Sequence, residues 1–365
     1  FLGVELLSIC LYILTGFSRR RLESEESAIK YLLLGAFASA FLLYGVALVY
    51  GSTGSTNLSC VGLAIGASGG LAGACDGAVA AGTASKAVLL AGVGLLIVGL
   101  GFKAALVPFH SWAPDVYEGA PTSITAYMSV GAKAAAFAAL LRVFLVAFPT
   151  ISPDWSVVLA IVATLTMVTG NAVALLQKNI KRMLGYSSIA HAGYILVAIV
   201  SASHLGATSL LVYAVAYAVM NMGAFAVVMA LGQAGNERTL ITDYAGLSRR
   251  QPLLAALMAA FMLSLAGIPP TFGFVGKFYV FSAAVESGFA WLALIGLLSS
   301  VASVYYYLRV VHQMYMVAPV GEAAEHVPGR WLSLVAVVAC GAVFLLGLFP
   351  GGVVAVANAS TMFVK

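Results

Sequence analysis

Charged residues are scarce in this sequence, and their scarcity excludes a soluble globular protein. Of the 365 residues only 8% are charged and 62% are hydrophobic, with a mean hydropathy of +1.03. A soluble domain carries about 25% charged residues, so this composition is typical of an integral membrane protein. The 18 basic residues exceed the 13 acidic ones and raise the pI to about 9.0. Basic residues at membrane edges explain this excess, which is no evidence for a nucleic-acid partner.

Cysteine is also rare, and its spacing excludes a metal centre. Cys10, Cys60, Cys75 and Cys340 stand alone, with no CxxC pair and no Cys/His cluster at ligand spacing. We therefore expect no metal or iron–sulfur site in this chain. Cys60 and Cys75 can form a disulfide in an outer loop, although two separately packed small residues are the favoured interpretation. The sequence also lacks a nucleotide-binding loop, a catalytic triad and a quinone-ring pocket.

The sequence begins without methionine and without the pattern of a signal peptide. It opens on "FLGVELLSIC", which is already apolar, whereas a signal peptide starts with a positively charged stretch. We therefore expect that the N-terminal part of the protein is missing from this sequence.

Long apolar runs are present, and each predicts a membrane-spanning helix because about 20 apolar residues cross a bilayer. The run at 252–285 is too long for one straight span, and Pro269 and Pro270 lie at its centre. Pro108 interrupts the run at 87–113 in the same way. The Gly-rich segment 51–85 predicts an outer surface loop with one short amphipathic helix. Ten runs occur, at 1–17, 29–50, 87–113, 121–147, 155–177, 184–202, 207–232, 252–285, 289–317 and 331–357.

The basic residues between the runs predict which loops are cytoplasmic, because cytoplasmic loops are rich in Lys and Arg. The opposite side holds only Lys86 and Lys365. The first run therefore leads from outside to inside, and the chain ends outside. The basic residues in the alternate loops are Arg19, Arg20, Arg21, Lys30, Lys178, Lys181, Arg182, Arg238, Arg249, Arg250 and Arg330.

The two interrupted helices predict an inverted repeat. They lie five segments apart, so they cross the membrane in opposite directions, and paired broken helices mark the ion path of many transporters. We predict an all-α polytopic membrane protein built from inverted five-helix repeats with two discontinuous helices. Residues 1–147 are then the last four helices of the first repeat, 148–317 the complete second repeat, and 318–365 a loop with a final transmembrane helix.

Five ionisable residues lie away from the ends of their helices: Glu5, Lys103, Lys133, His191 and Lys277. Each of them alone could be a polar group in helix packing. Five together are not well explained in this way, because ionisable groups inside a membrane are costly and mark ion pathways. We therefore predict that these five form a relay for protons.

Polar residues at helical spacing predict wet faces around this relay. A buried lysine whose carboxylate partner approaches and withdraws can take up and release a proton near neutral pH. Glu5 is the only carboxylate deep enough in a helix to pair with Lys103, so we predict that these two lie within ion-pairing reach, directly or through one water. The polar faces carry Thr122, Ser129, Ser187, Tyr194, Tyr213, Tyr217, Asn221, Ser299, Ser303 and Tyr306.

Other charged residues are assigned to surfaces. His110, Asp115 and Glu118 follow the Pro108 interruption, where solvation or helix capping is favoured over proton uptake. Arg142 and Arg309 are expected to extend their charges to a membrane interface. The acidic "ESEE" segment at 23–26 is interpreted as a solvated loop.

At these residues the sequence resembles the antiporter-like subunits of bacterial NADH:quinone oxidoreductase, respiratory complex I. The resemblance extends over nearly the whole chain, and "PDVYEGAPT" favours the subunit N family. It rests on "FLGVELLSICLYIL", "YGSTGSTNL", "GFKAALVPFHSWAPDVYEGAPTSITAYMSVGAKAAAF", "NAVALLQKNIKRMLGYSSIAHAGY" and "GIPPTFGFVGKFYVFSAAV".

The resemblance implies a fold of fourteen helices, of which the ten here match the fifth to the fourteenth. By motif match, Glu5 falls on the family's fifth-helix glutamate, Lys103 and Lys277 on the lysines of its two broken helices, and Lys133 on its connecting lysine. It implies a translocase subunit that moves protons while quinone is reduced elsewhere in the complex. This chain then holds no cofactor, and NADH, FMN, iron–sulfur clusters and quinone belong to sister subunits.

The same resemblance implies partners and a location. The partners are other membrane subunits of complex I, including neighbouring antiporter-like subunits, together with membrane lipid. The location is the bacterial cell inner (plasma) membrane, which the chain crosses several times. A stand-alone Mrp-type cation/proton antiporter remains the alternative, because it uses the same lysines. A purely structural membrane spacer is a third interpretation, which the buried ionisable residues argue against.

Overall fold

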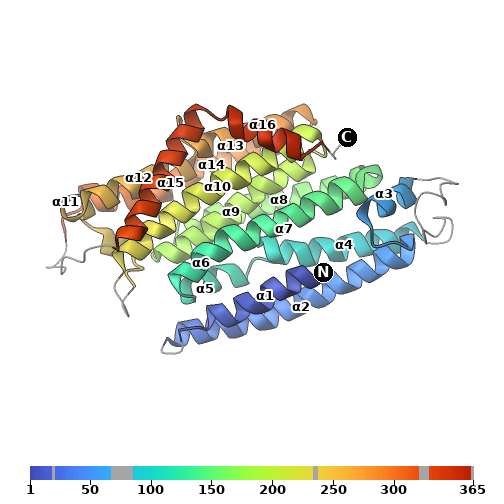
Figure 1. Cartoon of the computed structure of the whole chain (residues 1–365), viewed down its shortest axis with the longest axis horizontal. Coiled ribbons are helices and arrows are strands. Elements are labelled where there is room, and N and C mark those ends of the chain that lie inside the picture. The colour runs from blue at the N-terminus through green and yellow to red at the C-terminus, as the bar shows by residue number, and fades with distance from the viewer. Residues whose placement is uncertain (19–20, 67–84, 233–236, 320–328, 363–365) are drawn as a thin grey trace.

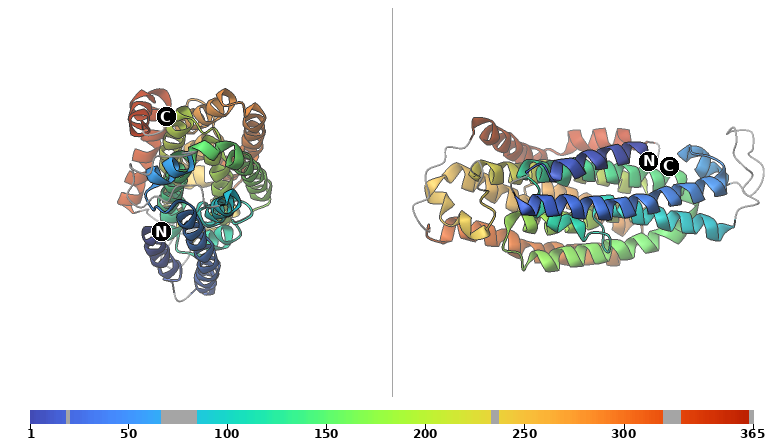
Figure 2. Two further views of the ribbon diagram at one scale, coloured as in Figure 1. Left: turned by 90° about the vertical axis from the view of Figure 1, so that its right-hand side faces the viewer. Right: turned by 90° about the horizontal axis from the view of Figure 1, so that it is seen from below.

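A computed structural model describes residues 1–18, 21–66, 85–232, 237–319 and 329–362, and every named element in these ranges is a helix. Most of the long helices run side by side along the long axis of an elongated bundle, and α15 crosses this direction at a steep angle (Figures 1 and 2). The first two form one edge, and the last two lie on the opposite edge. The α-helices are α1 Leu2–Thr15, α2 Leu22–Thr53, α3 Leu58–Gly66, α4 Lys86–Ala104, α5 Trp112–Gly119, α6 Thr122–Tyr127, α7 Lys133–Arg142, α8 Ser152–Ala174, α9 Ile180–Val200, α10 His204–Leu231, α11 Leu247–Arg250, α12 Pro252–Ala266, α13 Phe272–Glu286, α14 Ala290–Met316, α15 Arg330–Leu348 and α16 Gly351–Ser360.

Helices lie at all ten predicted runs. By length and composition, eight helical stretches of the described chain can cross a membrane. The run at 121–147 is one continuous stretch in which π-helical turns, η1 Met128–Ala132 and η2 Val143–Ala147, flank α7. The predicted short helix of segment 51–85 is α3, and residues 67–84 lie outside the described ranges. The chain is therefore a multi-pass all-α membrane protein, as predicted.

Both predicted helix breaks are confirmed. Residues 105–111 separate α4 from α5, and residues 267–271 separate α12 from α13. Pro108 lies in the first gap, Pro269 and Pro270 in the second, and none of them can donate a backbone hydrogen bond. Gly267 ends α12 with φ +87°, a conformation that glycine adopts without steric cost.

The two broken helices run in opposite directions, as ion pairs at the two ends of the bundle demonstrate. At one end, Asp115 of α5 pairs with Arg182 at the start of α9 at 2.7 Å. At the other end, Lys86 at the start of α4 pairs with Asp154 at the start of α8 at 2.9 Å. The pair α4–α5 therefore runs toward the Asp115 end, where α12 begins (Figure 1). We call this end cytoplasmic, following the distribution of basic residues. The division at residues 147 and 317 stays a prediction.

The structure corrects three local expectations. The run predicted as one helix at 331–357 is two, α15 and α16, because Pro350 lies between them. The "ESEE" segment is the first turn of α2 and not a loop, and Glu23 and Glu25 suit a helix N-terminus electrostatically. Cys60 is disulfide-bonded, so the favoured interpretation of two packed small residues is wrong for Cys60; Cys75 lies outside the described residues.

Helix α9 occupies the centre of the bundle and positions the polar groups described below. In the most apolar 18-residue stretch of α9, 94% of the residues are buried. It packs against α5, α8, α10 and α13, so its side chains reach both broken helices. A helix that is buried all round is apolar on every face, and the few polar residues of α9 are therefore the exceptions to explain.

Candidate functional site

Lys103 lies in the last turn of α4, directly before the first break. Its Nζ donates to Ser8 Oγ at 2.5 Å and to Tyr12 OH at 3.2 Å, both on α1. The ammonium also lies 5.5 Å from the centre of the Tyr12 ring, within cation–π range. Lys103 therefore holds α4 to α1 through neutral oxygens.

Of the two arrangements predicted for Glu5 and Lys103, direct or through one water, the direct ion pair is not formed. None of the ion pairs among the described residues joins these two side chains. The Glu5 carboxylate accepts from Ser39 Oγ of α2 at 2.7 Å. Ser8, one turn after Glu5 on the same face, takes the ammonium instead. A link through one water stays a prediction.

Lys133 is buried, with 3% of its surface exposed, and lies directly after the π-helical turn η1. Its Nζ donates to the backbone O and to Oγ of Ser188 on α9, each at 2.5 Å. One turn earlier, Ser129 accepts from Asn221 of α10 at 2.7 Å. Single π-turns are frequent at functional sites, and this one was not predicted from the sequence.

His191 lies at the middle of α9 with hydrogen bonds at both ring nitrogens. Nδ1 contacts Tyr213 OH at 2.7 Å, and Nε2 contacts Tyr307 OH at 3.1 Å. The Tyr307 hydroxyl also hydrogen-bonds Ser187. Because an imidazole can donate at one nitrogen and accept at the other, these groups form a continuous chain in which protons can shift.

Lys277 of α13 faces the second break. Its Nζ donates to the carbonyls of Leu265 and Ala266, each at 2.9 Å, and to Ser300 Oγ at 2.8 Å. These carbonyls are free because α12 ends there. An open cavity of about 610 Å³ between α13 and α14 reaches from Lys277 to Glu286 at the outer end of α13.

The structure gathers three of the five predicted residues, Lys133, His191 and Lys277, around α9. Lys133 binds Ser188, and the adjacent Ser187 leads through Tyr307 to His191. The ring of Tyr194, on the same helix, lies 5.1 Å from Lys277 Nζ. Within the described residues no hydrogen bond joins Lys103 to this group. A cavity of about 30 Å³ is lined by Lys103 and by Ala132 and Ala136 of the helical stretch that carries Lys133. That volume is large enough for a water molecule.

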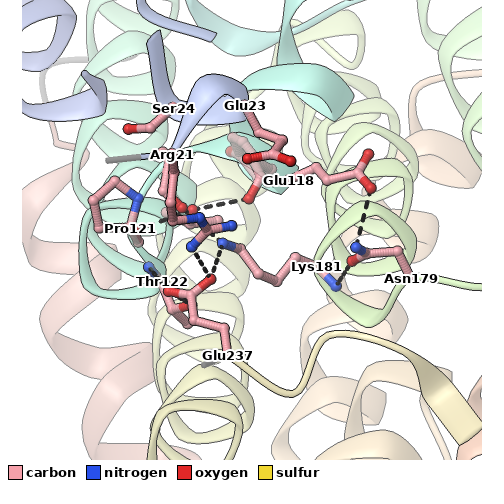
Figure 3. Close-up of polar contacts among 12 residues, drawn as sticks. Arg21, Glu23, Ser24, Glu118, Pro121, Thr122, Asn179, Lys181 and Glu237 are labelled. Carbon is pink, nitrogen blue, oxygen red and sulfur yellow. Dashed lines mark hydrogen bonds and ion pairs between the residues drawn. The ribbon is translucent and has the colours of Figure 1, made fainter. Parts of the chain in front are cut away.

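A cluster of charged side chains closes the cytoplasmic end, and sequence reasoning missed it. The Glu237 carboxylate receives Arg21 Nη1 at 2.7 Å, Lys181 Nζ at 3.0 Å, and the backbone N and Oγ1 of Thr122 at 3.2 and 2.9 Å (Figure 3). We call Arg21, Thr122, Lys181 and Glu237 the Glu237 cluster. Its members lie far apart in the sequence, so no local pattern could reveal it.

Asp115 and Glu118 both form ion pairs, which the sequence analysis did not predict. Asp115 receives Lys30 at 2.8 Å and Arg182 at 2.7 Å, and Glu118 receives Arg182 at 2.8 Å. Burial raises the pKa of Asp115, but hydrogen bonds from Lys30 and Arg182 outweigh burial and hold that pKa below its usual range.

Arg309 donates to the carbonyls of Leu175 at 3.0 Å and of Gln177, just before the loop that carries Lys178, and its predicted reach to an interface is untested. These carbonyls follow the last turn of α8, where backbone acceptors lack helical partners. Arg142 is exposed, and its predicted reach to an interface is untested.

An all-helical membrane bundle whose two broken helices each present a lysine, on either side of a buried polar centre, defines the class of antiporter-like membrane proteins. Residues 1–303 match the family described as NADH:quinone oxidoreductase/Mrp antiporter, transmembrane. The chain belongs to this family.

Particular relatives narrow the assignment. The chain is 54% identical over 315 residues to NADH-quinone oxidoreductase subunit N of Trichlorobacter lovleyi, covering 86% of this chain and 62% of that protein. It superposes on a chain of respiratory complex I from Thermus thermophilus with a TM-score of 0.80 at 40% identity, covering 97% of this chain and 73% of that one. It shares its fold, at 22% identity and a TM-score of 0.85, with a chain of the Mrp complex from Dietzia, covering 99% of this chain and 72% of that one. The resemblance to subunit N predicted from the motifs is confirmed.

Proposed function

We propose that this chain is a proton-translocating membrane subunit of a bacterial NADH:quinone oxidoreductase. The chain spans 62% of the length of the Trichlorobacter relative, so the activity of the whole protein is part of this proposal. One observation carries it: the buried Lys133 binds Ser188 on α9, and the adjacent Ser187 is joined through the Tyr307 hydroxyl to His191. A structural spacer has no need for such costly groups inside a membrane.

The position of each lysine and of His191 determines its role in proton transfer. Lys103 and Lys277 each lie beside a helix break. Lys277 binds carbonyls that the second break leaves free, and Lys103 lines a cavity large enough for a water molecule. Lys133 lies between them and His191 follows on α9, so lateral transfer runs from Lys103 through Lys133 and His191 to Lys277. Glu5 is the counter-charge on the Lys103 side, through a water that bridges the two groups.

Partners and cofactors follow from membership of a larger assembly. Neighbouring membrane subunits of complex I, including other antiporter-like subunits, pack against this chain in the bacterial inner membrane. NADH, FMN, iron–sulfur clusters and quinone are held by sister subunits, and redox energy reaches this chain through its neighbours. This chain itself contributes proton sites and no redox centre.

The test uses the full-length chain within its complex in membrane vesicles. Lys103→Ala and Lys277→Ala should leave NADH oxidation and assembly intact while lowering the number of protons moved per NADH. Lys86→Ala is the matched control, because Lys86 is an exposed lysine paired with Asp154 at the outer end. Normal proton movement in both test variants would overturn the relay.

A stand-alone cation/proton antiporter is the second candidate, which the shared fold of the Mrp chain favours. The two functions predict different proteins that copurify with this chain. A complex I subunit leaves the membrane in mild detergent together with a large NADH-oxidising assembly, whereas an antiporter does not. Purification through a tag on this chain, followed by an assay of NADH oxidation, decides between them.

A further inference from the structure

The Glu237 cluster joins parts of the chain that the polar relay also joins. Arg21 precedes α2, Thr122 begins α6, Lys181 lies in the first turn of α9, and Glu237 follows α10 (Figure 3). One carboxylate therefore connects four separate segments at the cytoplasmic end. By contrast, the ion pair at the outer end, Lys86 with Asp154, connects only two segments and is largely exposed.

Glu237 supplies a cap that α6 lacks. Pro121 precedes the helix, and no side chain of its own caps the helix start. The Glu237 carboxylate accepts from both the backbone N and the hydroxyl of Thr122. A carboxylate at a helix N-terminus satisfies a free N–H group and opposes the positive end of the helix dipole. The start of α6 is therefore held by a residue 115 positions away.

Lys181 connects Glu237, and through it the start of α6, to α9. Its side chain is fully buried, and its Nζ donates to Glu237 at 3.0 Å and to the carbonyl of Ala120 at 2.7 Å. A buried ammonium that loses its carboxylate is left with an uncompensated charge, which is strongly unfavourable. The carboxylate is also a fixed anion. Burial raises the pKa of Glu237, but the charge of Lys181 and hydrogen bonds from Arg21, Lys181 and Thr122 outweigh burial and lower it to about 2. A group this acidic does not carry protons at neutral pH.

The two attachments lie along the same pair of helical stretches. Thr122 and Lys133 belong to one continuous helical stretch, and Lys181 and Ser188 belong to α9. Eleven residues separate the first two, about 16 Å of helix, and seven separate the second two, about 10 Å. Two contacts between a pair of helices fix their relative shift and rotation, whereas one leaves a pivot.

We propose that Glu237 is a positioning residue, which holds the start of α6 against α9 so that Lys133 stays on Ser188. The inference rests on the proposed function, because it assigns a role toward the Lys133 relay. Glu237 touches no member of the relay itself, and it acts through the helix that carries Lys133.

The experiment combines two measurements on the full complex. Hydrogen exchange of the segment that begins α6 reports whether the attachment is intact, and protons moved per NADH in vesicles report the relay. Glu237→Gln removes the charge at nearly constant size. We expect exchange at the start of α6 to become about tenfold faster, which corresponds to about 1.4 kcal/mol. We also expect proton movement to fall as far as in Lys133→Ala, with NADH oxidation retained.

Two further variants sharpen the test. Asp154→Asn makes the same chemical change in the outer ion pair and should alter neither measurement. Lys181→Met combined with Glu237→Gln removes both charges of the ion pair. This double variant should recover part of the proton movement lost in Glu237→Gln, because in the single variant part of the loss comes from the unpaired Lys181 ammonium. This double variant also keeps the test valid if Glu237→Gln alone fails to assemble.

The outcomes separate two failures. Unchanged exchange in Glu237→Gln would overturn the attachment. Faster exchange with normal proton movement, while Lys133→Ala is impaired, would overturn the positioning role alone. Normal proton movement in Lys133→Ala would overturn the proposed function, and with it the role of Glu237. A double variant as impaired as the single one would show that Glu237 does not act through Lys181.

Discussion

The three lysines of the proposed relay share one feature at the scale of single residues: each ammonium hydrogen-bonds neutral oxygens. Lys103 binds a serine and a tyrosine, Lys133 a serine, and Lys277 two carbonyls and a serine. A carboxylate at contact distance strongly favours the charged form of a lysine, whereas neutral oxygens hydrogen-bond the ammonium and favour that form less. This arrangement suits the proposed relay, in which each lysine changes protonation state when water or a neighbouring charge moves.

Lys133→Arg tests whether this residue transfers a proton or only supplies a positive charge. Arginine keeps the charge but stays protonated at any working pH. If Lys133 transfers protons, the Arg variant should impair proton movement about as strongly as Lys133→Ala, measured as proton uptake by vesicles. Rescue by arginine would remove Lys133 from the relay and leave it as a fixed charge.

At the scale of elements, the breaks in α4–α5 and α12–α13 expose backbone acceptors inside the bundle, where a buried side chain can bind them. A continuous helix satisfies its own carbonyls, whereas a broken one leaves acceptors at its end. In the second break those acceptors are used by Lys277, and the turn depends on Gly267 at φ +87°. A Cβ added to Gly267 would lie 2.9 Å from Lys277 Cδ and 3.1 Å from its Nζ.

Gly267→Ala should therefore disturb both the turn and the lysine. A left-handed conformation costs a residue with a side chain about 1–2 kcal/mol, and the methyl group displaces the Lys277 side chain. We expect a lower melting temperature of the purified complex and reduced proton movement with NADH oxidation retained. Gly288→Ala is the matched control, because Gly288 also has a positive φ, +83°, but has no atoms within 4 Å of an added Cβ. Equal proton movement in the two variants would contradict the special role of the break.

At the scale of the whole molecule, the two ends are built differently. The cytoplasmic end is tied together by carboxylates that each receive two cations, Glu237 and Asp115, or one cation and an amide, Glu118. At the outer end the described chain has the exposed pair of Lys86 and Asp154, and exposed pairs contribute little to stability. Ionic attachment is thus concentrated at the cytoplasmic end.

This asymmetry predicts a dependence of stability on pH. The pKa of Glu237 is lowered from its ordinary value of 4.5 to about 2 by Lys181, Arg21 and Thr122, against the effect of burial. A lowered pKa in the folded state adds stability that is present above 4.5 and is lost as pH falls toward 2. The difference in melting temperature between the unmodified complex and its Glu237→Gln variant should be constant at neutral pH and should shrink below pH 4.5. A difference that does not change with acidification would contradict the ion pairs of Glu237.

The sequence alone predicted the elements of the site more fully than the contacts between them. Apolar length, proline and the positions of buried ionisable residues are local features, so the ten helical runs, the two breaks and the residues from Lys103 to Lys277 could be read directly. The partner of Lys133 could not, because Ser188 lies 55 residues away. The same holds for Tyr307, which is 116 residues from His191 and whose neighbour Tyr306 belonged to the predicted polar face.

The amino-acid sequence by itself determined that this protein crosses a membrane many times, that two of its helices break, and that amines lie inside it. These properties follow from the free energy of placing each residue type in lipid, which is set residue by residue. Only the tertiary structure decided that Ser8 and not Glu5 receives Lys103, and that Glu237 caps α6. Hydrogen bonds and ion pairs require contact within about 3 Å, and contact between distant segments is a property of packing that no local pattern records.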